Sequence, residues 1–427
     1  MKDKKIIRTS ALLATLCLLC TLCTSCFKSQ EDLFDEPASI RMQQHMEQVY
    51  AVLRSAEYGW EFEYYPGADL AYGGVVYLMK FDSLTVDVQC SLIADSVETS
   101  YYRMTNDNGP VLTFDTYNGL LHYFSTPSSI EYEAKGGEFE FVVREINEDE
   151  VLLYGKKTHN TAYLRRLKSD PADYVQRTIA NYDNFVQSFS GIVEGYVDLS
   201  SRSISLMGDS IHIPFAFTDK GIHLYYPVPM SGHRVQAFAF DAESNTLTCI
   251  DEGAEGLSLQ GTPVESSVMR FNQYEGRYNL RYNNGSSAVV SLVPNRLEGN
   301  YRLTGLSPKY QLVLNYDVES GDLTLGPQIV GDIDGVSVYL ATYNTAGNVW
   351  INEACSFTIH WNGNKFYPAY RFSPTNPNVA NCNSMMLITL YEDADGGLHA
   401  AIVDRGEWQT NGSAVFLNLS QLSKIFN

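Results

Sequence analysis

The chain has 427 residues and carries 50 acidic against 30 basic side chains, a formal net charge of −20. Binding to nucleic acid requires clustered lysine and arginine that neutralise phosphates, so this composition argues against a nucleic-acid partner. A chain of this length can form two or three domains with hydrophobic cores of their own.

The first 26 residues have the layout of a secretory signal peptide. A cationic start precedes an apolar run from Ala11 to Leu22, which is too short to span a bilayer about 30 Å thick. LCTSC, Leu22–Cys26, resembles a lipobox, although Cys23 stands where an aliphatic residue is usual. We expect removal of residues 1–25 and lipidation of Cys26, whose acyl chains, palmitate among them, then anchor the mature chain. Simple secretion is the alternative.

Residues 26–36 form a polar and mostly acidic tether, FKSQEDLFDE after the cysteine. It resembles the export signal that sends Bacteroidales lipoproteins to the outer face of the outer membrane, while a disordered linker would show the same composition. We therefore expect a lipid-anchored protein of the outer membrane that faces the cell exterior. Residues 1–25 hold four basic and one acidic side chain, so the mature chain would carry about −23.

Two helices and many short strands are expected beyond the tether. Apolar side chains at near-helical spacing predict a helix over 37–56, with Pro37 in a favourable first-turn position. Asp170 as a cap and Pro171 in the first turn begin a second helix that ends near 188. Alternating or short apolar runs between turn residues predict strands at 60–65, 75–81, 96–104, 111–117, 120–125, 137–146, 150–157, 191–199, 203–208, 210–218, 221–227, 235–241 and 246–252.

A third β-rich segment begins at Phe271. Asn284-Gly285 lies between two alternating runs and predicts a tight hairpin, and further strands follow at the spacing typical of a sandwich or small barrel. The fold class is therefore mainly β, with two or three antiparallel β-sandwich or barrel-like modules and two short connecting helices. A lipocalin-like barrel is one form that these modules could take. The expected domains are residues 37–167, 168–270 and 271–427.

Beyond the signal peptide, the expected mature chain has four cysteines besides Cys26, namely Cys90, Cys249, Cys355 and Cys382. They form no CxxC pair, which gives a structural zinc site little support. Cys355 and Cys382 are the only two close enough in sequence to suggest a local disulfide. Alternatively, the cysteines are buried free thiols. A long chain with so few cysteines favours this state, because it does not have the composition of a disulfide scaffold.

Signatures of catalysis are absent from the sequence. It has no HExxH, GxSxG, phosphate-binding glycine loop or dinucleotide fingerprint, and we expect no cofactor. His212 and His223 could be metal ligands but are more simply strand residues, and YEDADGGLH, Tyr391–His399, predicts a hairpin turn more readily than a calcium loop. We expect no metal site. A hydrolase could use two carboxylates that are close in space but distant in the sequence, and such a pair forms no sequence motif. A hydrolase therefore stays an alternative.

Two aromatic residues precede a proline three times, in EYYP, LYYP and KFYP. Residues before proline favour extended geometry and proline cannot continue a central strand, so the motif marks a strand that leaves its sheet. Side chains alternate across a strand, so one aromatic of each pair can fill the core while the other faces a cleft or solvent. The candidate ligand-binding residues are Tyr65, Tyr72, Tyr226, Trp361 and Tyr367.

The segments GWEFEYYP, YGGVVYLMKF, GPVLTFDTYN and PFAFTDKGIHLYYP resemble, in this order, the Bacteroidales lipoproteins called domain of unknown function 4302. The resemblance runs over nearly the whole mature chain, strongest from about Phe34 to Leu167 and looser beyond Phe271. It implies an accessory lipoprotein of starch-utilisation-type import loci, in which a TonB-dependent channel is paired with a ligand-capturing lid. The family supplies no catalytic or binding residues.

Together these observations favour a non-catalytic surface lipoprotein that binds a glycan, glycoprotein or peptide for import. Its partners would be that ligand and a TonB-dependent channel complex, and it would meet the membrane through its N-terminal lipid only. A secreted hydrolase and a structural or adhesive surface subunit are the alternatives.

Overall fold

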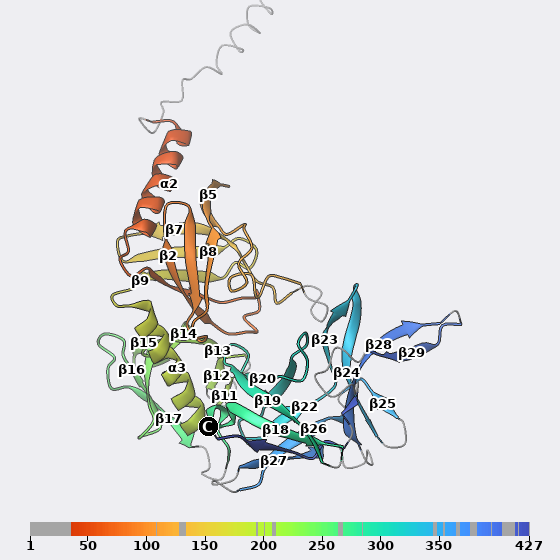
Figure 1. Cartoon of the computed structure of the whole chain (residues 1–427). Coiled ribbons are helices and arrows are strands. Elements are labelled where there is room, and N and C mark those ends of the chain that lie inside the picture. The colour runs from red at the N-terminus through yellow and green to blue at the C-terminus, as the bar shows by residue number, and fades with distance from the viewer. Residues whose placement is uncertain are drawn as a thin grey trace, which may run out of the picture. The chain divides into compact units, whose positions relative to one another are not determined.

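The computed structural model describes residues 36–107, 109–127, 134–193, 195–199, 201–206, 211–263, 268–283, 285–344, 348–352, 355–363, 368–375, 382–393, 395–403, 415–416 and 418–426 (Figure 1). Residues 49–427 form one compact unit. The first helix, α2 (Ala38–Arg54), buries Val49 and Leu53. Within the described part of the chain, no helix is both long and apolar enough to cross a membrane.

The first nine strands form one antiparallel sheet, here called ring 1. Its order is β4-β3-β2-β1-β9-β8-β7-β6-β5. The strands at its two edges, β4 and β5, are consecutive in the chain and only Tyr102 separates them, so the sheet must curl until its edges approach each other. The strands are β1 (Trp60–Tyr64), β2 (Val75–Phe81), β3 (Thr85–Cys90), β4 (Val97–Tyr101), β5 (Arg103–Asn106), β6 (Pro110–Thr113), β7 (Glu140–Ile146), β8 (Glu150–Gly155) and β9 (Thr161–Arg166).

A second sheet, ring 2, repeats this layout after helix α3 (Pro171–Ser188). The Asp170 side chain accepts a hydrogen bond from the Ala172 N–H at 2.8 Å, which is the cap that the sequence predicts. The order β10-β17-β16-β15-β14-β13-β12-β11 again puts two consecutive strands at the edges. The strands are β10 (Phe189–Ile192), β11 (Tyr196–Asp198), β12 (Ser203–Leu206), β13 (Ile211–Phe217), β14 (Gly221–Met230), β15 (His233–Asp241), β16 (Thr246–Cys249) and β17 (Ser258–Pro263).

A closed barrel follows the short 3₁₀ helix η2 (Phe271–Tyr274). It consists of β18 (Gly276–Tyr282), β19 (Ser286–Asn295), β20 (Asn300–Thr304), β21 (Leu312–Tyr316), β22 (Leu323–Leu325), β26 (Phe357–Trp361), β27 (Ala369–Pro374) and β31 (Gln421–Lys424). A further antiparallel sheet is inserted between its strands, made of β23 (Gln328–Ile333), β24 (Val336–Asn344), β25 (Val349–Trp350), β28 (Cys382–Glu392), β29 (Leu398–Ile402) and β30 (Val415–Phe416).

The described residues confirm the predicted fold class, which is mainly antiparallel β with barrel-like modules and two helices. The strand predicted at 120–125 is wrong, because this segment forms turns. The Asn118 side chain accepts hydrogen bonds from Leu120 N and Leu121 N, both at 3.1 Å, and His122 N donates to Asn118 O at 2.9 Å. Asn118 therefore caps a helical turn where the apolar run alone suggests a strand.

A fully buried arginine joins the two rings to the barrel. Arg202, 1% exposed, donates through Nε to Gly74 O at 2.8 Å. Its other guanidinium nitrogens donate to the carbonyls of Tyr72 and Leu297. Burial lowers the pKa of Arg202, since the charge has left water. Gly73 has a φ of 62°, and a Cβ there would collide with the Ser201 carbonyl and the Arg202 side chain.

Charged groups also meet where ring 1 packs on ring 2. Glu63 of β1 is buried and contacts Arg165 of β9 at 2.5 Å and His223 of β14 at 2.7 Å. Burial by itself would raise the pKa of Glu63, but the hydrogen bonds and electrostatic interactions with His223 and Arg165 outweigh it and lower that pKa to about 2. Glu61 is two residues away on β1, and its burial, aided by the Glu63 charge, raises its pKa to about 7.

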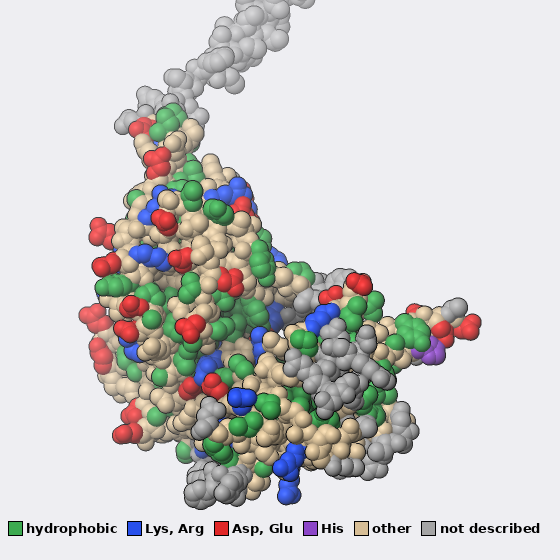
Figure 2. Space-filling view, viewed as in Figure 1, with side chains coloured by type: hydrophobic (Ala, Val, Ile, Leu, Met, Phe, Trp, Pro, Cys, Tyr) green, Lys and Arg blue, Asp and Glu red, His purple; other side chains and the backbone are tan. Residues whose placement is uncertain are grey.

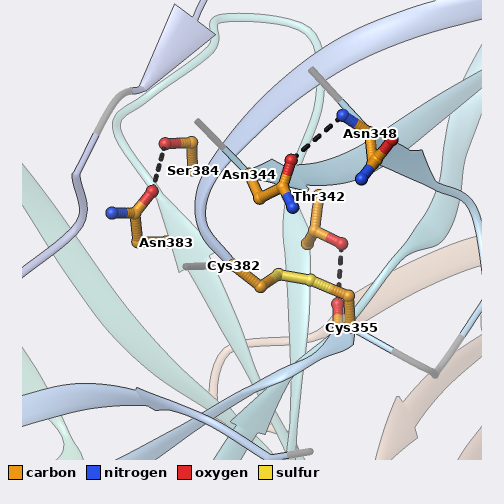
Figure 3. The surroundings of a disulfide bond; sticks show 7 residues. All are labelled: Thr342, Asn344, Asn348, Cys355, Cys382, Asn383 and Ser384. Atoms are coloured by element: carbon orange, nitrogen blue, oxygen red, sulfur yellow. Dashed lines mark hydrogen bonds between the residues drawn. A yellow bond between two sulfur atoms is a disulfide. The ribbon is translucent and has the colours of Figure 1, made fainter. Parts of the chain in front are cut away.

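A disulfide links the barrel to the inserted sheet. Cys355, just before β26, pairs with Cys382 at the start of β28, with 6.4 Å between their Cα atoms (Figure 3). Thr342 Oγ1 of β24 donates to Cys355 O at 2.6 Å beside the bond. Cys90 and Cys249 are buried free thiols. Both states that the sequence left open therefore occur, with the free thiols in ring 1 and ring 2 and the disulfide in the C-terminal part of the chain.

Reduction of this disulfide should destabilise the protein. Its partners are 27 residues apart, and closing a loop of that length removes unfolded-state entropy worth about 3–4 kcal/mol. Urea unfolding with and without reductant measures the loss. A Cys355→Ser, Cys382→Ser double variant should unfold at the same urea concentration as the reduced protein, and reductant should not change that midpoint. Equal midpoints for the oxidised and reduced protein would contradict the stabilising role.

The pair Glu61 and Glu63 should give opposite pH dependences. Folded Glu61 keeps its proton up to pH about 7, whereas the unfolded chain loses it near 4.5, so Glu61 lowers stability as pH rises through this window. Glu61→Gln should remove that loss. Its free energy of unfolding, relative to that of the wild type, should increase by about 1–2 kcal/mol between pH 4.5 and 7, a value lowered because the Glu61 side chain is partly exposed to solvent.

Glu63→Gln is the matched control. Glu63 stabilises the fold above pH 4.5, and this contribution disappears as pH falls toward 2. The variant should therefore be less stable than the wild type at neutral pH, and the deficit should shrink below pH 4.5. Urea unfolding at several pH values tests both variants, and a pH-independent difference for Glu61→Gln would exclude a raised pKa of Glu61.

Candidate functional site

A cleft of about 980 Å³ lies between a segment of ring 1 and the outer face of the barrel. The ring 1 wall is formed by residues around the turn after β6, including Tyr117, Tyr123 and Lys135. The barrel wall comes from β20, β21 and β22 and from the start of β23, with Arg302, Asn315, Tyr316 and Gln328 among its residues. The cleft therefore combines aromatic rings with hydrogen-bonding side chains, a composition that suits a polar organic ligand.

Strand alternation explains the barrel wall. On β20 the side chains of Tyr301 and Leu303 are buried inside the barrel, while Arg302 between them is exposed. Arg302 pairs across the ladder with Val313 of β21, and Asn315 two residues further pairs with Thr324 of β22. These outward-facing residues all line the cleft. In the described residues the Arg302 side chain has no ion pair or hydrogen bond, so its charge is available to a ligand.

Tyr117 forms an exposed aromatic platform on the opposite wall. It is 71% exposed, and its ring lies 5.6 Å from that of His122. His122 stacks in turn on Phe139 at 5.4 Å, and its Nδ1 lies 3.1 Å from Asn118 O. The row of rings supports Tyr117 from one side and leaves most of its surface open. A rigid ring of this kind can stack on an apolar face of a ligand at little entropic cost.

Glu298 fixes the two walls to each other. Its Oε1 accepts hydrogen bonds from Lys135 at 2.5 Å and from the Tyr123 hydroxyl, both in ring 1. Its Oε2 accepts from the amides of Asn295 at 3.0 Å and Asn300 at 3.1 Å. Burial opposes ionisation, but the Lys135 and Tyr123 hydrogen bonds outweigh it and lower the pKa of Glu298 to about 2. The walls of the cleft are thus joined by an ionised carboxylate.

This carboxylate is poorly suited to serve as a general acid. A general acid needs a pKa near the working pH, and that of Glu298 is far below it. The other acid in the lining, Asp317, accepts backbone N–H groups of Glu319 and Ser320 at 2.9 and 2.8 Å through its Oδ1. Glu63 and His223 form a carboxylate–imidazole pair, but neither lines the cleft. No three His, Cys, Asp or Glu residues of the described chain lie together as a metal site.

The five residues singled out in the sequence are not brought together. Tyr65 is only 2% exposed and its hydroxyl donates to Glu63 Oε1 at 2.9 Å, which corrects the expectation of a surface contact. Both faces of β1 are covered, one by the ring 1 core and the other by ring 2, so Tyr64 and Tyr65 are both buried. Tyr72 is half-buried and lines a cavity of about 180 Å³ that shares Lys135 and Glu298 with the cleft.

The other predicted residues lie apart from the cleft or outside the described chain. Tyr226 is 53% exposed and packs on Tyr225 with 4.5 Å between ring centroids, but it does not line the cleft. Trp361 lines a separate pocket at the barrel. Tyr367 falls outside the described residues. His212 lies 3.2 Å from the Ser205 hydroxyl, and His223 contacts Glu63, so their separate partners explain both without a metal.

Sequence reasoning missed Tyr117, Tyr123, Arg302 and Tyr316. The signal for Tyr117 was present, because TYNGLLHY places an aromatic residue directly before an Asn-Gly turn. The strand expected at 120–125 concealed that turn. Arg302 could be predicted to face outward from the alternation in YRL, but no pattern shows which outward face of the barrel meets ring 1.

Comparison with known families covers most of the chain. Residues 30–242 match the family described as "Domain of unknown function (DUF4302)". Residues 250–388 match a second family, DUF4987, described as "Domain of unknown function". The extension of the DUF4302 resemblance beyond Phe271 is therefore wrong, since that part matches a different family. No curated protein matches the chain. Through residues 30–242 the chain belongs to the DUF4302 family, as its sequence resemblance predicted, and DUF4987 follows it.

Proposed function

We propose that this protein is a lipid-anchored outer-membrane lipoprotein, facing the cell exterior, that captures a glycan without chemical conversion. It would serve as an accessory of a nutrient-import system with a TonB-dependent channel. The observation that carries the proposal is the cleft, in which the exposed Tyr117 ring lies across from a barrel wall that holds the Arg302 side chain, for which the described residues provide no ion pair. A sugar offers both an apolar face for stacking and hydroxyls for hydrogen bonds.

A glycan suits the cleft better than the other ligands considered. The barrel wall of the cleft presents polar side chains from neighbouring strands, namely Arg302, Asn315 and Thr324. These side chains can form hydrogen bonds with successive hydroxyl groups of a glycan. A peptide would more often add to a free strand edge, whereas the cleft uses side chains on a closed barrel. The low pKa of Glu298 supports the non-catalytic part of the proposal.

Glycan binding should depend on the two walls of the cleft. Soluble residues 30–427, which keep every described residue, are tested on an immobilised panel of glycans, glycoproteins and peptides. Tyr117→Ala and Arg302→Gln should each weaken capture of the bound glycan about tenfold, equivalent to about 1.4 kcal/mol. Tyr226→Ala is the matched control, because it removes an exposed tyrosine outside the cleft.

The outcomes separate the alternatives. Unchanged binding by both cleft variants would move the site elsewhere, and a loss with Tyr226→Ala alone would favour the aromatic-proline motif. Release of shorter sugars from a bound polymer would contradict a non-catalytic role. Capture of peptides but no glycan by the folded protein would overturn the ligand class.

Anchoring should depend on Cys26. In cells that express the full chain, the wild type should incorporate labelled palmitate, sediment with outer membranes and be digested by protease added outside intact cells. Cys26→Ser should lose the label and leave the membrane fraction. Labelled wild type that resists external protease until the cells are broken would instead place it on the periplasmic side. Label retained by Cys26→Ser would contradict this lipidation site.

A further inference from the structure

The strands of the closed barrel differ in charge from the chain as a whole. They contain no aspartate or glutamate, whereas their basic residues are Arg277, Arg281, Arg302, Arg371 and Lys424. In the whole chain acidic residues predominate, 50 against 30 basic, and Figure 2 shows them scattered over the visible side of rings 1 and 2. Strands without an acid in so acidic a protein leave room for a local basic surface.

Two of these arginines belong to one row of outward-facing side chains, here called the arginine row. Arg371 of β27 pairs with Gln421 of β31, and Gln421 pairs with Arg281 of β18. Ser287 of β19 continues the row beyond Arg281. Tyr370, the neighbour of Arg371, is buried inside the barrel, so alternation along the strand directs Arg371 to the outside.

The two arginines of the row are not engaged by an acid. Both are exposed, and within the part of the chain that the structure describes neither side chain makes an ion pair or a hydrogen bond. His360 of β26 is the ladder partner of Arg371 on the other side, and its Nδ1 lies 2.8 Å from Asp322 Oδ2. Asp322 is thus engaged by His360, and both guanidinium groups can meet an external anion.

The spacing of the two arginines favours a ligand with repeated anionic groups. They lie on β18 and β27, which flank β31, and two strand spacings put their backbones roughly 10 Å apart. A single small anion is shorter than this. Alternate residues of an extended acidic polysaccharide project their carboxylates to one side with a repeat of similar length, and a guanidinium binds a carboxylate through two parallel hydrogen bonds.

The other side chains of the arginine row suit a glycan better than a protein partner. Gln421 lies between the arginines and Ser287 at one end, and both can hydrogen-bond to hydroxyl groups. The row has no aromatic or aliphatic side chain, whereas the centre of a stable protein interface is apolar and depleted in charge.

We infer that the arginine row binds an acidic polysaccharide, a polyuronate, that lies across β27, β31 and β18. Its carboxylates meet Arg371 and Arg281, and its hydroxyl groups meet Gln421 and Ser287. The inference does not rest on the cleft, because none of the residues of the arginine row lines it.

Calorimetry with oligogalacturonate, with its methyl ester and with monomeric galacturonate tests the inference. The ester keeps the rings and removes the charges, and the monomer offers one carboxylate to two arginines. The oligomer should bind, with affinity that falls as salt rises. The ester and the monomer should each bind at least about tenfold more weakly than the oligomer.

Substitutions locate the binding surface. Arg281→Gln and Arg371→Gln should each weaken binding of the oligomer at least about fivefold, because each removes one of the two charges. Lys220→Gln is the matched control and should leave binding unchanged, since it removes one exposed positive charge in ring 2. All three side chains are exposed, and near-ultraviolet circular dichroism and thermal unfolding establish that each variant is folded.

Several outcomes would overturn the inference. They are no binding of the oligomer by the folded protein, equal binding of oligomer and ester, and full binding by both arginine variants. An equal loss with Lys220→Gln would reduce the effect to net charge, and tighter binding of a sulfated glycan of the same length would replace the carboxylate by a sulfate. Tyr117→Ala tests the cleft separately, so failure of one site is distinguishable from failure of the other.

Discussion

The arrangement of this protein depends on the buried guanidinium of Arg202. A buried cation is costly unless its donors are satisfied, and here the acceptors are main-chain carbonyls of Tyr72, Gly74 and Leu297. Two of them belong to ring 1 and one to the barrel, while the arginine itself precedes β12 of ring 2. All three modules must be in place for the charge to be solvated, so their packing is one cooperative event rather than three independent ones.

The position of the cleft follows from how the modules are built. In each module most neighbouring strands are also consecutive in the chain, and each module begins with a helical segment, α2, α3 or η2. In this protein, buried side chains of the strands fill the interiors of the modules, so the described cleft lies on an outer face. The cleft uses an outer face of the barrel that ring 1 meets, and Glu298 fixes that meeting.

Local signals in the sequence were sufficient to predict most of the helices and strands. Asp170-Pro171 predicts the start of α3, and the apolar run at 75–81 coincides with β2, because caps and burial act over a few residues. The errors arise where residues outside a run decide its conformation, whether they lie directly before it or far away in the sequence. Asn118 turns an apolar run into a helical turn, and ring 2 covers the face of β1 from which Tyr65 was expected to emerge. The residues of an apolar run do not show which module will cover them or which neighbouring side chain will cap them.

The sites were harder to predict for a related physical reason. Alternation in YRL indicates that Arg302 faces outward, but whether an outward residue meets solvent, a cleft or another module is fixed by packing. The acceptors of Arg202 are carbonyls, which every residue possesses, so no residue type marks them. The walls of the cleft are therefore set by how the modules pack on one another, and the pattern within a single strand indicates only which side chains face outward.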